Sequence, residues 1–224
     1  TPAAAAAIVQ PRQTKGGIII SPATLLYPPY TAASHNPVFA IQTQKYLDTD
    51  VRATGRSRFS LRMGGRFGIV RWPSAEDPER GVQVDFEAGY TGLFDLENHT
   101  DNLGYDGIYG FQVSWTATRD LALRLRTFHA SSHLGDEYME ESERVRIGYT
   151  REGIAIGASW EPAPDWRTYI EGGYAIPPGD KPFIEHLHAQ CGLEYFAPPT
   201  FCNNTLGWYA ATDITTYEEN DWSA

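Results

Sequence analysis

Long stretches of this chain alternate between apolar and polar residues, and this period of two constrains the fold more than any other feature. Between Ser57 and Trp72, apolar side chains occupy most odd positions from Phe59 to Ile69, while arginine, serine and glycine occupy the even positions. The stretch at 82–91 repeats the pattern. Successive side chains of a β-strand point to opposite faces, so each stretch predicts a strand with one apolar and one polar face.

The alternation continues along the chain and predicts about nine antiparallel strands. Besides 57–72 and 82–91, we expect strands at residues 38–46, 107–117, 121–131, 153–160, 167–175, 188–196 and 207–217. Tight turns at 116–120 and 161–165 alternate with long acidic loops at 96–106 and 133–151, as they do in outer-membrane barrels. Several strands reach ten residues, which is longer than is usual in a soluble β-sandwich.

The composition excludes several other classes of protein. Lys and Arg number 18 against 28 Asp and Glu, a net charge of −10, and no basic stripe accompanies a nucleic-acid motif, so we expect no nucleic-acid partner. No apolar run reaches the roughly 18 residues of a transmembrane helix, whereas the strands of a transmembrane barrel hide their hydrophobicity in alternation. Trp72, Trp115, Trp160 and Trp166 fall near predicted strand ends, as in the aromatic girdles of such barrels.

The polar faces of neighbouring strands carry opposite charges. Arginines lie on the polar face of 57–72 and carboxylates on that of 82–91, so the charges would meet if these strands paired as a hairpin. Arg167 and Glu171 extend the same chemistry to a later strand. Such faces could coat a soluble protein, but we favour an antiparallel transmembrane β-barrel, in which apolar faces contact lipid and charges pair in the lumen. The expected lumen ladder consists of Arg58, Arg62, Arg66, Asp85, Glu87, Arg124 and Arg126.

The first 36 residues are Pro-rich and irregular, and we expect them to form a segment distinct from the barrel, which would span residues 37–224. The stretch at 22–37 is typical of a segment that a protein partner orders, or that plugs the barrel. Cys191 and Cys202 lie in a segment rich in Pro and Asn. They could form a disulfide in an exported protein or stay free in a reducing compartment, and the sequence leaves both alternatives open.

One group of residues carries candidate chemistry. His129, Ser131 and His133 share the parity of the apolar residues in 121–131, so they face lipid unless a bulge turns them inward. This His-x-Ser pattern is similar to that of outer-membrane phospholipase A and the lipid A 3-O-deacylase, in which His is the base and Ser attacks an acyl ester. The resemblance implies that Ser131 and His129 are catalytic, with Glu143 or Glu152 orienting the histidine.

Two other interpretations of this group stay open. These residues could have a structural role only, hydrogen-bonding to loop carboxylates. Alternatively, His133, Asp136 and Glu137 could hold a divalent cation. We expect no other cofactor.

Several stretches resemble a bacterial family known only as domain of unknown function 1207. They are residues 26–30 (LYPPY), 62–68 (RMGGRFG), 128–138 (FHASSHLGDEY), 160–162 (WEP), 166–167 (WR) and 171–174 (EGGY). The resemblance covers roughly residues 25–222 and implies an exported β-barrel of the bacterial outer membrane without an established activity. Members continue with further strands, and nine is not the even number expected of a bacterial barrel, so we expect the chain to be an incomplete piece of a larger barrel of about twelve strands. A smaller closed barrel of about eight or ten strands is the alternative.

These observations predict a structural or assembly barrel of the outer membrane, with its lumen filled by its own charged side chains. A lipid acyl hydrolase and a pore for small solutes are the alternatives. The expected partners are outer-membrane lipid and a protein that binds the N-terminal segment.

Overall fold

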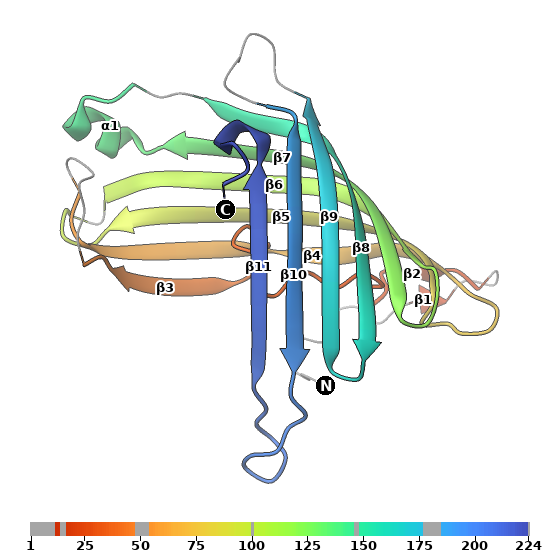
Figure 1. Ribbon diagram of the computed structural model, residues 1–224. Coiled ribbons are helices and arrows are strands. Elements are labelled where there is room, and N and C mark those ends of the chain that lie inside the picture. Colours follow the sequence, from red (N-terminus) through yellow and green to blue (C-terminus); the bar gives the residue numbers. More distant parts are fainter. Residues whose placement is uncertain are drawn as a thin grey trace.

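Antiparallel strands form one curled sheet in the computed structural model of the chain, which describes residues 12–13, 17–47, 54–99, 101–145, 148–176 and 185–223 (Figure 1). The remaining residues, which include 1–11 and 14–16 of the predicted N-terminal segment at 1–36, lie outside the described part. The strands are β1 (Arg12–Gln13), β2 (Ile19–Ile20), β3 (Ala40–Lys45), β4 (Ser57–Pro73), β5 (Gly81–Asp95), β6 (Asp101–Thr116), β7 (Leu121–Leu134), β8 (Tyr149–Ala163), β9 (Trp166–Ile176), β10 (Leu187–Phe196) and β11 (Tyr209–Tyr217).

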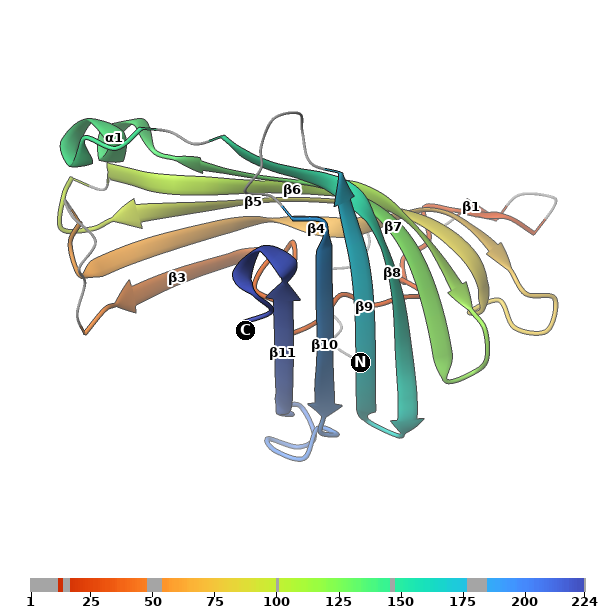
Figure 2. The ribbon, with the colours of Figure 1, turned by 45° about the horizontal axis from the view of Figure 1, so that its top comes forward.

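The nine strands from β3 to β11 curl into a half-barrel, which confirms the all-β antiparallel fold and the nine predicted strands (Figures 1 and 2). Each pairs with its neighbours in sequence, so that β3 and β11 lie at opposite ends of this nine-strand sheet. The sequence did not predict β1 and β2, which pair with each other, while β2 also pairs with Val70 and Arg71 of β4. None of the helices in the described ranges has the length and hydropathy to span a membrane.

The predicted alternation of short and long connections is only partly correct. The expected loop at 96–106 is short, because β6 begins at Asp101 and its polar first residues pair with β5. Leu103 is bulged out of that pairing, which interrupts the alternation and conceals the strand in the sequence. The expected loop at 133–151 contains the end of β7 and a short helix, α1 (Asp136–Ser142). A long connection at 197–208 joins β10 to β11 on the side predicted to have short turns.

The helix α1 follows from its residues. Asp136 and Glu137 lie in its first turn, where carboxylates interact favourably with the helix dipole. Tyr138 is buried, and the helix packs beside β6. The helix ends at Glu143, whose left-handed backbone (φ 55°) stops the helical hydrogen bonding.

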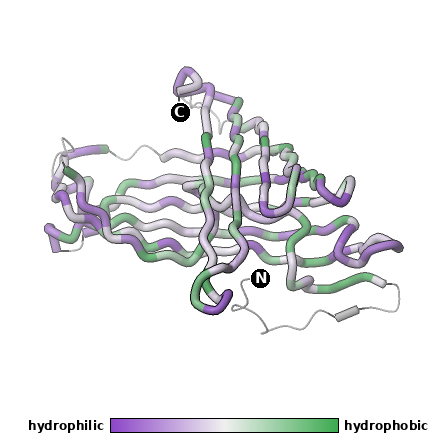
Figure 3. The backbone as a smooth tube through the Cα atoms, turned by 60° about the horizontal axis from the view of Figure 1, so that its bottom comes forward, coloured by the Kyte–Doolittle hydropathy of each residue, from purple (hydrophilic) through white to green (hydrophobic). Residues whose placement is uncertain are grey.

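The sheet is polar on its concave face and apolar on its convex face. Asp85 and Glu194 are fully buried on the concave side, whereas Ile156 and Ile170 are 65 % and 64 % exposed on the convex side. Figure 3 shows hydrophilic and hydrophobic residues interspersed along the strands. A bulge between Gly68 and Val70 shifts the parity of β4, so that the buried Arg71 faces inward and the exposed Trp72 faces outward.

Candidate functional site

A proline-rich stretch at residues 22–37, here called the inner segment, lies against the concave face of the sheet (Figure 2). Arginine side chains from the strands donate hydrogen bonds to its backbone carbonyl oxygens. Arg167 binds those of Pro28 and Pro29 at 2.7 and 2.9 Å. The other contacts are Arg71 to Thr24 (2.7 Å), Arg66 to Tyr27 (3.2 Å), and Arg62 to Ser34 and Asn36 (2.6 and 2.7 Å).

The inner segment binds arginines because of its own chemistry. Proline has no backbone N–H, and the segment consists of bends and turns without a helix or strand, so most of its carbonyl oxygens need donors from elsewhere. The segment also donates a hydrogen bond to the sheet: the backbone N–H of Thr31 binds the buried carboxylate of Glu194 at 2.6 Å. Buried backbone groups without partners are costly, so these bonds fix the position of the segment.

Two tyrosines fasten the inner segment to the sheet. Tyr27 and Tyr30 are buried, and their hydroxyl groups lie 2.7 Å apart. The Tyr30 ring stacks on the ring of Tyr169 in β9, with centroids 3.7 Å apart. The Arg124 guanidinium lies 4.6 and 4.5 Å from the centroids of Tyr27 and Tyr30. Burial raises the pKa of the Tyr30 phenol far above its usual value, although Arg124 opposes this shift, so Tyr30 is a neutral donor to Glu171 (3.3 Å).

Below these tyrosines, arginines and glutamates form one connected network. Arg66 and Glu87 face each other directly across β4 and β5, 2.5 Å apart. Arg126 binds Glu87 at 3.4 Å and Glu171 at 2.8 Å. Arg124 also binds Glu171. Each carboxylate therefore contacts two arginines, which compensates charges that would be costly to bury alone.

The seven residues of the predicted ladder do not all join this network. The structure brings together Arg66, Glu87, Arg124 and Arg126, with Glu171 as the partner of both Arg124 and Arg126. Asp85 instead accepts hydrogen bonds from amide and hydroxyl groups, those of Gln83, Gln112 and Ser114. Arg58 is buried beside the Tyr46 ring, 4.2 Å from its centroid, and Arg62 binds carbonyl oxygens of the inner segment.

Sequence reasoning missed the parts of this site that come from the inner segment and from β10. Glu194 is fully buried and binds both Arg167 (2.9 Å) and Thr31. The sequence pattern of β10 could have identified Glu194, because His188 and Glu194 occupy the strand face that alternates with apolar residues. No periodic signal marked Tyr27 and Tyr30.

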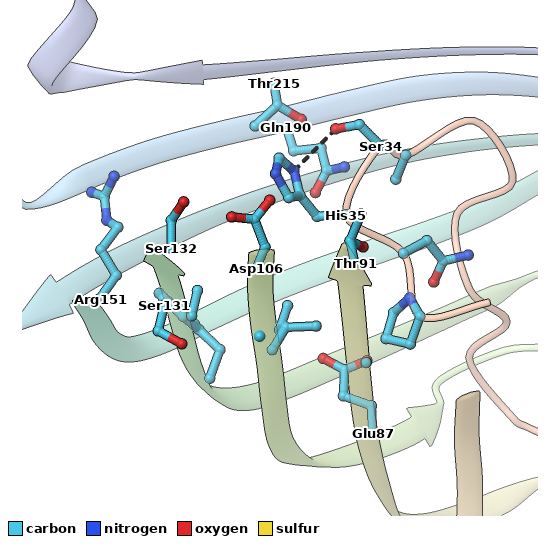
Figure 4. A pocket seen from close by; sticks show the side chains of 18 of the residues that line it. Ser34, His35, Glu87, Thr91, Asp106, Ser131, Ser132, Arg151, Gln190 and Thr215 are labelled. Carbon is cyan, nitrogen blue, oxygen red and sulfur yellow. Dashed lines mark hydrogen bonds between the residues drawn. The ribbon is translucent and has the colours of Figure 1, made fainter. Parts of the chain in front are cut away.

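A cavity of about 430 Å³ lies between the inner segment and the strands (Figure 4). Figure 4 shows Asp106, Ser132 and Arg151 on the strands and Ser34 and His35 on the inner segment. The paired arginines of the network form part of the same lining, together with Phe128 and Ile108. The cavity is thus bounded by both charged and apolar groups.

Of the predicted catalytic residues, His129 and Glu152 pair directly on β7 and β8, Ser131 lies on β7 and also borders the cavity, and Glu143 lies at the end of α1. The β6–β7 register is unshifted from Gly104 to Thr116, so His129 and Ser131 keep their outward parity. His129 stacks on Tyr109 (centroids 4.5 Å apart), and its Nδ1 lies 3.2 Å from Glu152 Oε1. Within the described residues no hydrogen bond joins Ser131 to His129. Glu143, the other candidate partner of His129, ends α1. The structure therefore supplies a histidine and a carboxylate without the nucleophile contact.

The weaker candidates are not assembled into sites. The His133 ring lies tilted against the Tyr105 ring, with centroids 5.1 Å apart, and Asp136 and Glu137 begin α1. In the ranges that the structure describes, no three His, Cys, Asp or Glu residues are grouped as metal ligands. The disulfide considered for Cys191 and Cys202 is not formed, and both thiols are free and exposed. Cys191 lies inside β10, five residues before its end, whereas Cys202 lies in the loop beyond, and two bonded cysteines need Cα atoms within about 7 Å.

Comparison with known proteins gives one match. The family model described as a protein of unknown function (DUF1207) matches residues 3–224, which confirms the resemblance noted in the sequence. No curated protein and no solved structure matches the chain. The chain therefore belongs to the DUF1207 family of proteins of unknown function.

Proposed function

We propose that this chain forms part of the wall of a β-barrel in the bacterial outer membrane, with a structural or assembly role and a lumen closed by the inner segment. The observation that carries the proposal is the inverted polarity of the sheet. Charged side chains are buried on the concave face, and large apolar side chains are exposed on the convex face. Transmembrane barrels have this arrangement, because their outer face contacts hydrocarbon.

The extent of the convex apolar surface supports a lipid environment. Soluble monomers rarely expose contiguous apolar patches larger than a few hundred Å², because each Å² of apolar surface in water costs roughly 25 cal/mol. Adjacent strands here present exposed apolar residues in register, as in the cross-strand row Val113, Leu125 and Ile156. Lipid would remove this cost. Further exposed residues on this face are Met63, Phe67, Phe111, Ile154, Ile170, Ile176, Leu193 and Ile214.

Aromatic residues border this surface at both ends of the strands. Five of the six tryptophans lie at the rim where β4–β5, β6–β7, β8–β9 and β10–β11 are connected: Trp72, Trp115, Trp160, Trp166 and Trp208. The opposite rim carries stacked pairs of rings, among them Tyr90–Tyr105 and Tyr174–His186. Trp and Tyr favour the two membrane interfaces, so these rims are suited to the head-group levels.

The distance between the rims agrees with a bilayer. On β6, Tyr105 precedes Trp115 by ten residues. At roughly 3.4 Å per residue and a strand tilt of about 40°, this separation spans about 25 Å, which is the usual height of the apolar band on an outer-membrane barrel.

A closed lumen has a direct electrical test. The protein as the cell makes it, purified in detergent and inserted into planar lipid bilayers, is expected to give no stable single-channel current, because the inner segment and the paired arginines fill the interior. Insertion is checked separately by flotation with lipid vesicles. Stable open currents from inserted protein would contradict the closed lumen and favour the solute pore.

A further inference from the structure

The connection between β10 and β11 differs in charge from the three other hairpin connections at the tryptophan-rich rim. Residues 197–208 contain no charged side chain. The connections at 74–80, 117–120 and 164–165 are shorter, yet they carry four, two and one charged residues. The uncharged stretch continues into both strands and covers residues 195–212. Water does not exclude charged side chains, so the longest of these connections indicates a different environment.

Backbone hydrogen bonds make this connection, here called the uncharged hairpin (197–208), a defined structure. Phe201 and Leu206 face each other across it, and each backbone N–H donates to the carbonyl oxygen of the other at 3.1 Å. The tip turns through left-handed backbone at Asn203 and Asn204 (φ 55° and 61°), a conformation that asparagine adopts more readily than most residues. Figure 1 shows the uncharged hairpin extending past the ends of β10 and β11.

The side chains of the uncharged hairpin suit the boundary between lipid and water. Phe201, Leu206 and Trp208 are each more than half exposed. The polar side chains between them are neutral hydroxyl and amide groups of threonine and asparagine, apart from the thiol of Cys202. Aromatic rings favour the head-group level of a membrane, and neutral polar groups enter it without the cost of dehydrating a charge.

The base of the uncharged hairpin is continuous with the convex apolar face. The rings of Trp166, Tyr195 and Trp208 form a row, with successive centroids 4.8 and 5.2 Å apart. Trp166 has the parity of the exposed Ile170 on β9, so this row borders the convex face. The uncharged hairpin therefore extends the surface that we propose to contact lipid.

The distance from this row sets the depth of the apolar pair. Leu206 lies two residues beyond Trp208, and two residues reach at most about 7 Å. The polar layer on each side of a bilayer is roughly 5–8 Å thick. With Trp208 at the boundary of the hydrocarbon, Leu206 and its partner Phe201 lie within the head-group layer even if the hairpin stands upright.

We propose that the uncharged hairpin binds the head-group layer of the leaflet at the tryptophan-rich rim, with Phe201 and Leu206 against the ends of the acyl chains. The inference rests on the proposed membrane location and adds a specific lipid-binding element to it. The hairpin would hold the ends of β10 and β11 at the membrane surface, whereas the three charged connections lie in water.

The first test uses the cysteine at the tip as the attachment site of a nitroxide spin label. The full protein with Cys191→Ser is labelled at Cys202 and placed in phospholipid nanodiscs, which leave both membrane faces accessible. A neutral nickel complex and oxygen are the two relaxation agents. The ratio of oxygen to nickel accessibility is expected to be at least about threefold higher at 202 than at the matched control, Glu76→Cys with Cys191→Ser and Cys202→Ser, on the exposed connection 74–80.

A third label, at Phe111 in the middle of the convex face, separates the two ways in which the inference can fail. If 111 is shielded from nickel while 202 is as open to it as 76, the hairpin does not bind lipid. That result would overturn the inference, leave the membrane location intact and assign the apolar pair to a protein partner. If nickel reaches all three labels equally, the inference fails together with the membrane location.

Variants then test the apolar pair. Phe201→Asp with Leu206→Asp is expected to lower the ratio at 202 to that at 76, because two carboxylates would have to lose water in the head-group layer. Both side chains are exposed and the hairpin is held by backbone bonds, so the fold should persist. The matched control, Ala75→Asp with Thr118→Asp, adds the same charge to two connections of this rim and should leave the ratio at 202 unchanged. An unchanged ratio in the Phe201 and Leu206 variant would overturn the proposal.

Discussion

Replacing Glu171 by glutamine is expected to lower the free energy of unfolding by about 3–5 kcal/mol, since breaking a buried ion pair leaves an uncompensated charge. Glu171 is 1 % exposed and binds both Arg124 and Arg126. It also accepts the hydrogen bond from Tyr30, so the variant should loosen the inner segment as well. Urea unfolding in detergent micelles, followed by tryptophan fluorescence, measures the change.

The control for this prediction is Glu161→Gln, which removes the same charge from an exposed position near the β8–β9 turn. It should change stability by no more than about 0.5 kcal/mol. The double variant Arg124→Met with Glu171→Gln should lose less than the sum of the single losses, because it also removes one stranded arginine. A Glu171→Gln protein as stable as Glu161→Gln would show that the network does not hold the interior together.

Placing arginine at Ile156 is expected to destabilise the protein in lipid by about 2–4 kcal/mol, the cost of a cation at the middle of the hydrocarbon. Ile156 lies midway along β8 and is 65 % exposed on the convex face. In water the same substitution at an exposed site would change stability by about 0.5 kcal/mol at most. Reversible unfolding in phospholipid vesicles provides the measurement.

Depth provides the matched control for this second prediction. Trp166 lies at the tryptophan-rich rim, where a cation reaches the head groups. The charge introduced by Trp166→Arg should therefore lower the free energy of unfolding by about 1 kcal/mol or less. Loss of the Trp166 contact with Tyr195 (centroids 4.8 Å apart) is assessed with Trp166→Gln. Equal costs for the charge at positions 156 and 166 would argue against a bilayer around this face.

The strands were predictable because their physics is local. An alternation of apolar and polar residues can be recognised from neighbouring residues alone, so β4 to β9 followed from the sequence. The same alternation placed Arg66 and Glu87 on one face of the sheet, where the strand register sets them opposite each other. The alternation fails where a bulge inserts a residue, and for that reason the first part of β6 resembled a loop. Small register shifts of this kind leave no mark on composition.

The inner segment could not be positioned from sequence, because its partners are distant. Arg167 binds Pro28 and Pro29 across nearly 140 residues, and Thr31 binds Glu194 across 163. No local pattern encodes such contacts. The cavity follows from the same long-range packing, and so do the separate environments of Asp85 and Glu87, which the sequence placed in one ladder.

The outward orientation of His129 was predictable from parity alone, whereas its chemistry was not. Both Glu143 and Glu152 were candidate partners, and the strand register places Glu152 directly opposite His129. Ser131 lies one full strand repeat further along the same face, opposite Thr150. A repeat of two residues spans about 7 Å, so sharing a face does not bring a serine and a histidine into contact.

Whether the convex face contacts hydrocarbon can be measured directly with spin labels at Phe111, Ile156 and Arg119, each replaced by cysteine after Cys191→Ser and Cys202→Ser. In lipid vesicles, labels at 111 and 156 are expected to be accessible to oxygen and shielded from a water-soluble nickel complex. A label at 119, on the turn, should show the reverse. If nickel reaches 111 and 156 as readily as 119, or if the protein stays monomeric in buffer without detergent, the convex face is not embedded in a membrane.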